Sequence, residues 1–429
     1  MRSYLTDQCV TIFPFTQRPD GEETIIANST NSAILALPSS AVDILMWLAQ
    51  GQTIGETQSL YEQKYGEIPD IEDFLDLLEN EGFVSSKIET PHSADSVASQ
   101  RIDSPASRPT KAVKRYHFES ISQDVARRIF SRPVLLSCGL LSGIGLAMVA
   151  FDPSIIPPPQ ILVFRQNLTL TSLGLYCFIF ITVFFHEMAH LVAARAAGVP
   201  AQLGISHRLW VLVAQTDMTG IWMASKRQRY LAVLAGPILD VFISSILIVI
   251  IFFQHHRWIT ISPTLILFCQ IALFTYLIRL LWQCYLFVRT DFYYVLAIMF
   301  NCKNLMEDTE TFLQNQCARF IPQIRQVDQS SIPQREMRVI HYYALIWIVG
   351  RIAAFLSLFI ITIPILAGYY FEIGGFLFGG HAPSSLVAAD TTGWIFVAAI
   401  PTFLQSAGFI LWIRSFYLAR RTNHAKQAA

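Results

Sequence analysis

Residues 181–198, ITVFFHEMAHLVAARAAG, decide the fold, because an otherwise apolar helical run carries His186, Glu187 and His190. Two histidines four residues apart lie one turn apart on the same helix face, and the adjacent glutamate can reach a water held between them. This pattern is typical of zinc hydrolases. The alternative is a pair of hydrogen-bonded core histidines beside a paired glutamate. Ionisable groups inside a membrane helix are costly and usually functional, so the stretch predicts a metal site in a membrane protein.

The overall composition agrees with a membrane location. The chain has 429 residues, of which 53% are hydrophobic and 14% charged, and its mean hydropathy is +0.43. This balance is typical of polytopic membrane proteins. The formal net charge is zero, which gives no sign of a nucleic-acid partner. Seven cysteines without CxxC spacing indicate reduced packing residues, neither disulfides nor a cysteine metal site.

Long apolar runs predict six membrane-spanning helices by the twenty-residue rule. They lie at about 133–151, 168–190, 230–253, 260–287, 339–367 and 393–413. With a cytoplasmic N-terminal region, the outer loops 152–167, 254–259 and 368–392 hold only Arg165 and Arg257 as cations. This asymmetry predicts a multi-pass protein of the cytoplasmic (inner) membrane with both termini in the cytoplasm, anchored in the lipid bilayer.

The direction of the spans suggests a third metal ligand. Spans two and four both run inward, so the two histidines and Asp291, the one acid at the end of span four, should lie at similar depth near the cytoplasmic face. A catalytic zinc ion needs three protein ligands and one open position. Asp291 fits the role of the third ligand.

Span three begins LAVLAGPILDVF and should pass close to the site. Gly236 and Pro237 favour close helix approach and a local kink. Asp240 follows one turn later in apolar surroundings. It could support a ligand from behind, serve as a rival third ligand, or hydrogen-bond between helices.

Residues 1–88 predict a small α+β domain. The β-rich runs CVTIFP, ETIIAN and SAILAL precede three helices, and FVSSKI could close the domain as a strand. The predicted helix caps are Ser39 or Ser40, Thr53 with Glu56 three residues later, and Asp70. Residues 89–132 are expected to form a flexible linker and a basic juxtamembrane segment, and residues 133–429 the membrane domain, with its core at 168–306.

The N-terminal pattern resembles the PqqD-like winged-helix domain, which recognises leader peptides of ribosomally made, modified peptides. The features that carry the resemblance are IIANSTNSAILAL, LPSSAVDILMWLAQGQTIGE and DIEDFLDLLENEGFV. A DNA-binding winged helix is disfavoured, because its recognition helix should be basic and the third helix here is acidic. The resemblance implies peptide recognition; a purely structural or oligomerisation module is the alternative.

HEMAH on one span, AGPILD on the next and VRTDFYY after span four are similar to the site-2-protease family of intramembrane zinc metalloproteases, in its bacterial peptide-maturation branch. The resemblance implies Zn²⁺ ligands His186, His190 and Asp291, and Glu187 as catalytic base. The chain departs from the family at four positions, with Asp240 for Asn, Phe292 for Gly, Gln283 for Asn and Leu286 for Pro. An ionised carboxylate at position 240 cannot donate the amide hydrogen bond. Supporting or substrate-orienting roles are expected for Asp240, Gly236, Pro237 and Gln283.

The expected architecture is mainly α, a polytopic membrane helical bundle with a small N-terminal α+β winged-helix-like cytoplasmic domain. Residues 200–229 should form a β-hairpin or re-entrant element whose edge could pair with an extended peptide, or else a plain cytoplasmic loop. The expected function is a zinc metalloendopeptidase that cleaves a hydrophobic or membrane-associated peptide near the cytoplasmic side during peptide maturation. The alternative is a non-catalytic peptide-binding membrane protein that acts with a peptide exporter or processing partner.

Overall fold

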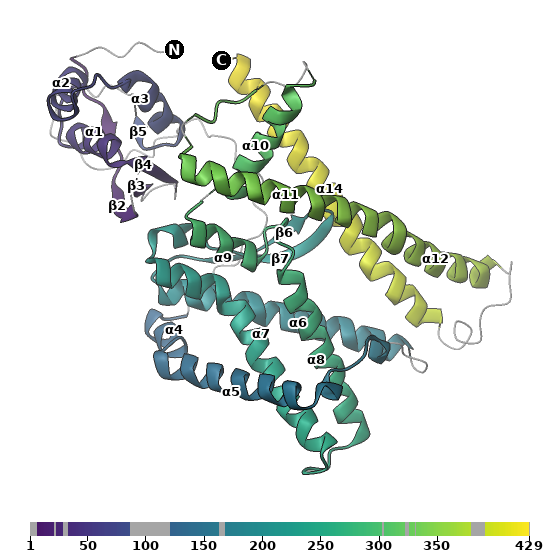
Figure 1. Ribbon diagram of the computed structural model, residues 1–429. Helices are drawn as coiled ribbons and strands as arrows, with labels where there is room; N and C mark the ends of the chain where they lie inside the picture. The colour runs from purple at the N-terminus through teal and green to yellow at the C-terminus, as the bar shows by residue number, and fades with distance from the viewer. Residues whose placement is uncertain are drawn as a thin grey trace, which may run out of the picture. The chain divides into compact units, whose positions relative to one another are not determined.

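The structure is a computed structural model that describes residues 7–20, 23–28, 33–85, 121–162, 168–302, 304–321, 326–330, 332–378 and 391–428 (Figure 1). The chain forms two compact units. Unit 1 comprises Met1–Ala112 with Thr219–Ser225, and unit 2 comprises Val113–Met218 with Lys226–Ala429. Most of the predicted linker, with Lys111, Lys114 and Arg115, and the outer-loop residue His381 lie outside the described residues.

Among the described residues of unit 1, strands precede the helices and a short strand follows them, as predicted, but one strand more than predicted precedes the helices. β2 (Phe15–Asp20), β3 (Glu23–Asn28) and β4 (Ile34–Pro38) form an antiparallel sheet in that order, and β1 (Thr11–Ile12) pairs with β5 (Val84–Ser85). The sequence reasoning missed β2, which contains Pro19. Because β2 lies at the sheet edge, it tolerates a residue without a backbone N–H donor.

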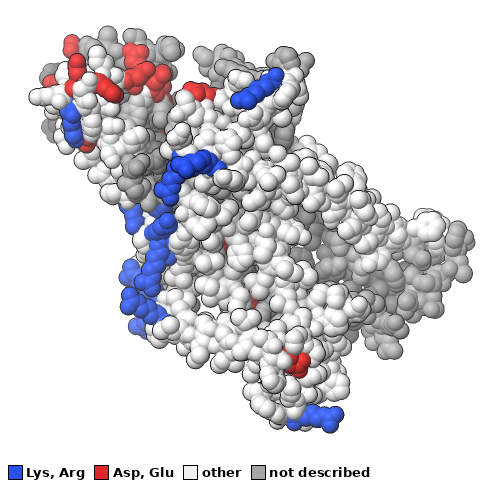
Figure 2. Space-filling model, in the orientation of Figure 1, with Lys and Arg blue, Asp and Glu red and all other residues white. Residues whose placement is uncertain are grey.

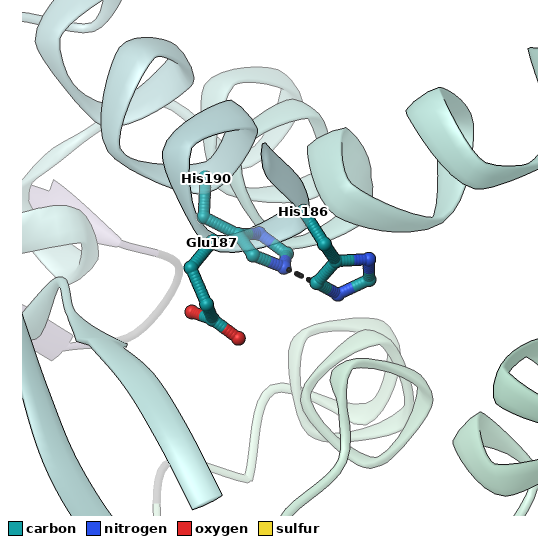
Figure 3. A group of neighbouring side chains, drawn as sticks. All are labelled: His186, Glu187 and His190. Carbon is teal, nitrogen blue, oxygen red and sulfur yellow. Dashed lines mark hydrogen bonds between the residues drawn. The ribbon is translucent and has the colours of Figure 1, made fainter. Parts of the chain in front are cut away.

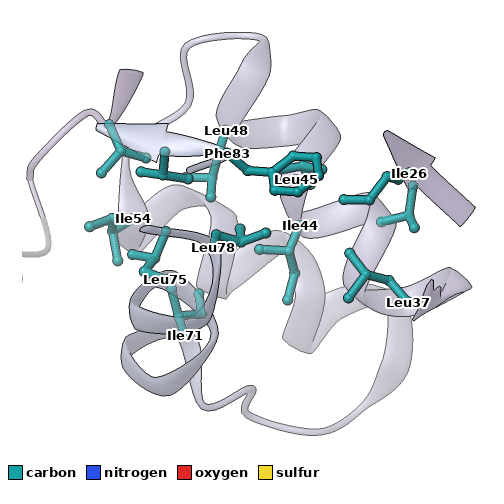
Figure 4. Close-up of a cluster of buried hydrophobic side chains, with 13 residues drawn as sticks. Ile26, Leu37, Ile44, Leu45, Leu48, Ile54, Ile71, Leu75, Leu78 and Phe83 are labelled. Atoms are coloured by element: carbon teal, nitrogen blue, oxygen red, sulfur yellow. The ribbon is translucent and has the colours of Figure 1, made fainter. Parts of the chain in front are cut away.

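Three helices cover this sheet: α1 (Ser39–Ala49), α2 (Ile54–Tyr65) and α3 (Ile71–Asn80). The Thr53–Glu56 capping box and the Asp70 cap are confirmed. The predicted serine cap of α1 is wrong, because the chain passes directly from β4 into the helix and Pro38 occupies the cap position. Figure 4 shows the core between these elements, in which Leu45, Leu75, Leu78 and Phe83 are fully buried.

Unit 2 is helical. Its helices are α4 (Gln123–Ile129), α5 (Arg132–Phe151), α6 (Leu168–Ala196), α7 (Lys226–His255), α8 (Pro263–Gln283), α9 (Asp291–Phe300), α10 (Leu305–Ala318), α11 (Gln334–Ser357), α12 (Ile363–Phe378) and α14 (Thr391–Ala428). Six helical segments among the described residues are long and apolar enough to cross a membrane, which confirms the predicted polytopic class. They are Gln123–Phe151, Ser172–Ala196, Lys226–His255, Pro263–Gln283, Gln334–Gly375 and Ile395–Ser415.

α7 lies at the centre of the helices that carry the predicted site. It packs against α5, α6, α8 and α9 (Figure 1). Contacts from Asp240 reach back to His186 on α6 and forward to Arg279 on α8, and His190, one turn later on α6, reaches the earlier α7 residue Ala232. α6 and α7 are therefore antiparallel. Arg279 also contacts Thr182, one turn before His186 on α6, so the C-terminal end of α8 lies close to the level of the histidines, as the parity of the spans predicted.

Residues 202–217 form the predicted β-hairpin. β6 (Gln202–Arg208) pairs antiparallel with β7 (Val211–Asp217), and Leu209 takes a positive φ of 55° in the turn. α14 passes directly over this turn. A Cβ on Gly408 would lie 2.4 Å from the Trp210 carbonyl oxygen, so glycine permits this approach.

Candidate metal centre

The two histidines of the HEMAH stretch meet on one face of α6. His186 and His190 lie one helical turn apart, with 3.3 Å between their Nε2 atoms. Both side chains are buried, with exposed fractions of 4% and 2%. Glu187 leaves the helix beside them, and ligand atoms of all three residues lie within 4.8 Å of one another (Figure 3).

Asp291 joins this pair from another element. Its Oδ2 atom lies 3.1 Å from His186 Nε2 and 3.3 Å from His190 Nε2. Asp291 is not at the end of the fourth span, as the sequence suggested. α8 ends at Gln283, and Asp291 is the first residue of the short helix α9. Its carboxylate therefore lies at a helix N-terminus, where negative charge is favoured.

Hydrogen bonds on the far side of each imidazole ring set the ring orientation. His190 Nδ1 lies 2.8 Å from the carbonyl oxygen of Ala232, and His186 Nδ1 lies 2.8 Å from Asp240 Oδ2. A carbonyl oxygen only accepts hydrogen bonds, so Nδ1 of His190 carries the hydrogen and the neutral ring has its lone pair on Nε2. Asp240 thus contacts the nitrogen of His186 that faces away from Asp291.

Arg279 is a residue that the sequence reasoning missed. Its guanidinium donates from Nε to Asp240 Oδ2 at 2.8 Å and from the second terminal nitrogen to Oδ1 at 2.6 Å. The remaining terminal nitrogen donates to Thr182 Oγ1 at 3.0 Å. A cation inside the apolar fourth span could have indicated a functional group, since such residues are rare in membrane helices.

Gly236 forms one wall of the site. A Cβ at this position would lie 2.5 Å from the Nε2 atom of each histidine, closer than any real contact. Only glycine therefore leaves space beside the two nitrogens. Pro237 lies inside α7 and is buried. It has no backbone N–H, which removes one hydrogen bond from the helix at this point.

Glu187 is held by the hairpin. Its Oε2 atom accepts from the backbone N–H of Thr216 at 2.7 Å and lies 2.8 Å from the Thr216 hydroxyl. That hydroxyl also lies 2.9 Å from the main-chain oxygen of Glu187. β7 is therefore tied to α6 directly beside the histidines. No local sequence signal pointed to Thr216, because the contact depends on how the hairpin folds back.

The segment between α8 and α9 fixes Asp291. The side-chain oxygen of Gln283 accepts from the Asp291 backbone N–H at 3.0 Å, and Thr290 caps α9 while donating to the Gln283 carbonyl oxygen. Gln283 thus supports the carboxylate rather than facing the histidines. Phe292, where the related family has glycine, lies within the first turn of α9 and needs no positive φ.

Two contacts from α11, the fifth span, hold the segment between α8 and α9. The Tyr343 hydroxyl of α11 donates to the Leu286 carbonyl oxygen at 2.7 Å. A Cβ on Gly350 would lie 2.0 Å from Cδ1 of Phe287, so α11 approaches the segment too closely for any other residue at this position. α11 therefore helps to place Asp291.

Acidic groups gather on α10, outside the membrane spans. Glu307 on α10 pairs with Arg289, which lies in the segment between α8 and α9. Burial, together with the neighbouring charge of Glu307, raises the pKa of Asp308 to about 6.

The donor set fits a zinc ion. In tetrahedral coordination with bonds of about 2.0–2.1 Å, ligand atoms are separated by about 3.3–3.4 Å. The three separations among His186 Nε2, His190 Nε2 and Asp291 Oδ2 are 3.1, 3.3 and 3.3 Å. Electron-pair donors this close repel one another unless a cation or protons lie between them. Two imidazoles and one carboxylate are also a ligand set of catalytic zinc sites.

His255 and His256 form a second histidine pair. His255 ends α7 and His256 follows it in the turn, with Nε2 atoms 3.5 and 3.4 Å from Asp152 Oδ2. His255 is exposed and His256 is partly buried against Phe252. The pair lies at the opposite end of α7 from Gly236 and takes no part in the candidate centre.

The comparisons agree with this centre. No curated protein and no solved structure matched the chain. The family model described as Peptidase family M50 matches residues 174–366, which run from α6 into α12 and include the histidine pair, Asp240 and Asp291. Residues 174–366 are therefore similar to the M50, or site-2 protease, family, and the activity that this family indicates is that of an intramembrane metalloprotease.

Proposed function

We propose that unit 2 is a zinc endopeptidase in which His186, His190 and Asp291 hold the metal and Glu187 is the catalytic base. One observation carries the proposal. Nε2 of each histidine and Oδ2 of Asp291 form a triangle with sides of 3.1–3.3 Å, and the Glu187 carboxylate lies beside it. The metal that fits this triangle is Zn²⁺.

Zinc, when bound, would polarise a peptide carbonyl and lower the pKa of water toward neutrality. The Glu187 carboxylate would accept a proton from that water and return it to the leaving amine. Thr216 donates two hydrogen bonds to Oε2 of Glu187, which fixes the carboxylate and leaves Oε1 for proton transfer. Peptide-bond hydrolysis needs no further proton carrier.

The substrate is proposed to be a hydrophobic or membrane-associated peptide that enters from the cytoplasmic side. The histidines lie near the C-terminal end of α6, and exposed cations gather at the same end of the neighbouring helices, at Arg127, Arg128, Arg132, Lys226 and Arg227. Figure 2 shows blue side chains gathered along one edge of unit 2. Since cations favour cytoplasmic segments, this edge is proposed to face the cytoplasm in an inner membrane, with both termini on that side.

Unit 1 is proposed to be a PqqD-like domain that delivers the peptide. Its element order supports this role, because the β2–β4 sheet, the α1–α3 helices and the closing strand β5 give a small fold with open sheet edges for strand addition. Figure 2 shows red side chains on unit 1, and the exposed acids Glu72 and Asp73 lie on α3. An acidic surface is unsuited to nucleic acid. A role in peptide maturation beside a peptide exporter follows from this proposal.

The test compares the wild type with Glu187→Gln in detergent or proteoliposomes. Both proteins should bind one zinc ion, measured by elemental analysis, but only the wild type should produce new peptide termini from candidate precursor peptides, measured by mass spectrometry. Removing the metal with a chelator should stop cleavage, and added zinc should restore it. Equal cleavage by Glu187→Gln would contradict the proposal. Zinc binding without cleavage of any candidate by the wild type would favour the non-catalytic peptide-binding alternative.

A further inference from the structure

Arg279 is a charged residue inside the membrane-spanning helix α8, and its guanidinium is paired with a carboxylate. The guanidinium binds both carboxylate oxygens of Asp240 and lies 4.6 Å from the centre of the Tyr276 ring. Its side chain is 13% exposed and that of Asp240 is 1% exposed. A buried cation is tolerated in such a helix where it is paired, and this geometry is the bidentate arrangement that only arginine makes.

The contacts of Arg279 converge on one metal-site histidine. Asp240 Oδ2 accepts from Arg279 and also contacts His186 Nδ1, both at 2.8 Å. Thr182, the third partner of the guanidinium, lies one turn before His186 on the same face of α6. Arg279 on α8 is thus connected to His186 by two routes, one through α7 and one through α6.

Asp240 and Arg279 each compensate the charge of the other. Without Arg279, the fully buried carboxylate of Asp240 would keep only the His186 ring as a side-chain hydrogen-bond partner among the described residues. Without Asp240, the guanidinium would lose both of its charge-assisted bonds. Breaking one side of a buried pair is costly, whereas replacing both partners by neutral groups is much less so. The two residues therefore act as a unit.

We propose that Arg279 is a positioning residue for the metal centre, which acts through Asp240 to hold the His186 ring with Nε2 toward Asp291 and His190. The inference rests on the proposed zinc function. It assigns Asp240 the role of supporting a ligand from behind, and it explains why a carboxylate, rather than a neutral amide, occupies position 240. Arg279 does not touch the reacting atoms.

The experiment is a double-mutant cycle on the full chain in detergent, with Arg279→Gln, Asp240→Asn and the double variant Asp240→Asn/Arg279→Gln. Arg351→Gln is the matched control, because Arg351 also lies in an apolar span, pairs with an acid, Glu310, and stacks on an aromatic ring. The measurements are the zinc dissociation constant by chelator competition and the visible absorption of the cobalt-substituted protein, which reports ligand geometry. Supporting partners of metal ligands typically contribute 10–100-fold in affinity.

Arg279→Gln should weaken zinc binding by about 10–100-fold and change the cobalt spectrum, and the double variant should recover most of the loss. Arg351→Gln should leave both measurements unchanged. Unaltered zinc binding by Arg279→Gln would overturn the inference, as would a double variant no better than Arg279→Gln. If Arg279→Gln fails to fold, the folded double variant still tests the inference, because the inference predicts that this variant binds zinc nearly as the wild type does. A wild type that binds no zinc would instead overturn the proposed function and the inference with it.

Discussion

Replacing Gly236 with alanine should weaken the metal centre without changing any ligand. The added Cβ would lie 2.5 Å from both histidine Nε2 atoms and 2.6 Å from Cε1 of His186. Ordinary van der Waals contact needs about 3.5 Å, so each ring or the α7 backbone would have to move by about 1 Å. Both rings are fixed by hydrogen bonds at Nδ1, and neither can turn away without breaking its bond.

The expected magnitude follows from the cost of overpacking. Inserting one carbon into a well-packed interior typically costs about 1–3 kcal/mol, and about 1.4 kcal/mol corresponds to a tenfold change in an equilibrium constant. If the strain falls on the metal-bound geometry, the zinc dissociation constant should rise by about 10–100-fold. Cleavage should fall in parallel at limiting zinc.

The assay is chelator competition with purified protein, together with thermal denaturation. Gly174→Ala is the matched control, because Gly174 lies on α6 itself and its added Cβ would meet nothing within 4 Å. The control should bind zinc as the wild type does. A Gly236→Ala variant with the zinc affinity of the wild type would refute the reasoning, since it would mean that the space beside the two nitrogens is not needed by the metal.

Asp291→Ala should abolish stoichiometric zinc binding, measured by elemental analysis, and a full metal content would remove Asp291 from the ligand set. Thr216→Val keeps the strand but loses the hydroxyl that contacts Glu187. Because a hydrogen bond to a charged group contributes about 1.5–3 kcal/mol, cleavage should fall about tenfold or more while the zinc content stays unchanged. Unaltered turnover would argue against a role for this bond. The pKa of Asp308, raised to about 6, means that the folded state loses stability as pH rises through that value. Asp308→Asn should therefore increase the free energy of unfolding at pH 7.5 by about 1 kcal/mol once the partial exposure of the group is considered, which a higher melting temperature would show. The difference should disappear near pH 4.5, and an equal difference at both pH values would contradict this explanation.

The membrane fold and the histidine pair could be predicted from sequence because both rest on local patterns. Apolar length alone identifies the six spans. Helix periodicity places His190 one turn beyond His186. The parity of the spans brought Asp291 to the same depth as the histidines, although the helix that carries it was misjudged. Capping by Thr290 starts a separate helix there, and the apolar residues before it concealed the break.

The remaining features depend on contacts between distant segments. Asp240 was noticed as an isolated acid, but its pairing with Arg279 needed the antiparallel packing of α7 and α8. The bond between Thr216 and Glu187 joins residues 29 positions apart and depends on the return path of the hairpin. The edge strand β2 was hidden by Pro19, whose local preference favours a turn. In each case tertiary packing, not local propensity, determined the outcome.

The close fit of α11 against Phe287 has a consequence for the smallest active fragment. Sequence motifs end near residue 306, which suggests a core that ends after the fourth span. Gly350 and Tyr343, however, hold the connection that presents Asp291, and they lie in the fifth span, about forty residues beyond the last motif. A shortened protein should therefore keep its metal only if it is cut after α11, so the smallest metal-binding fragment should reach the end of the fifth span.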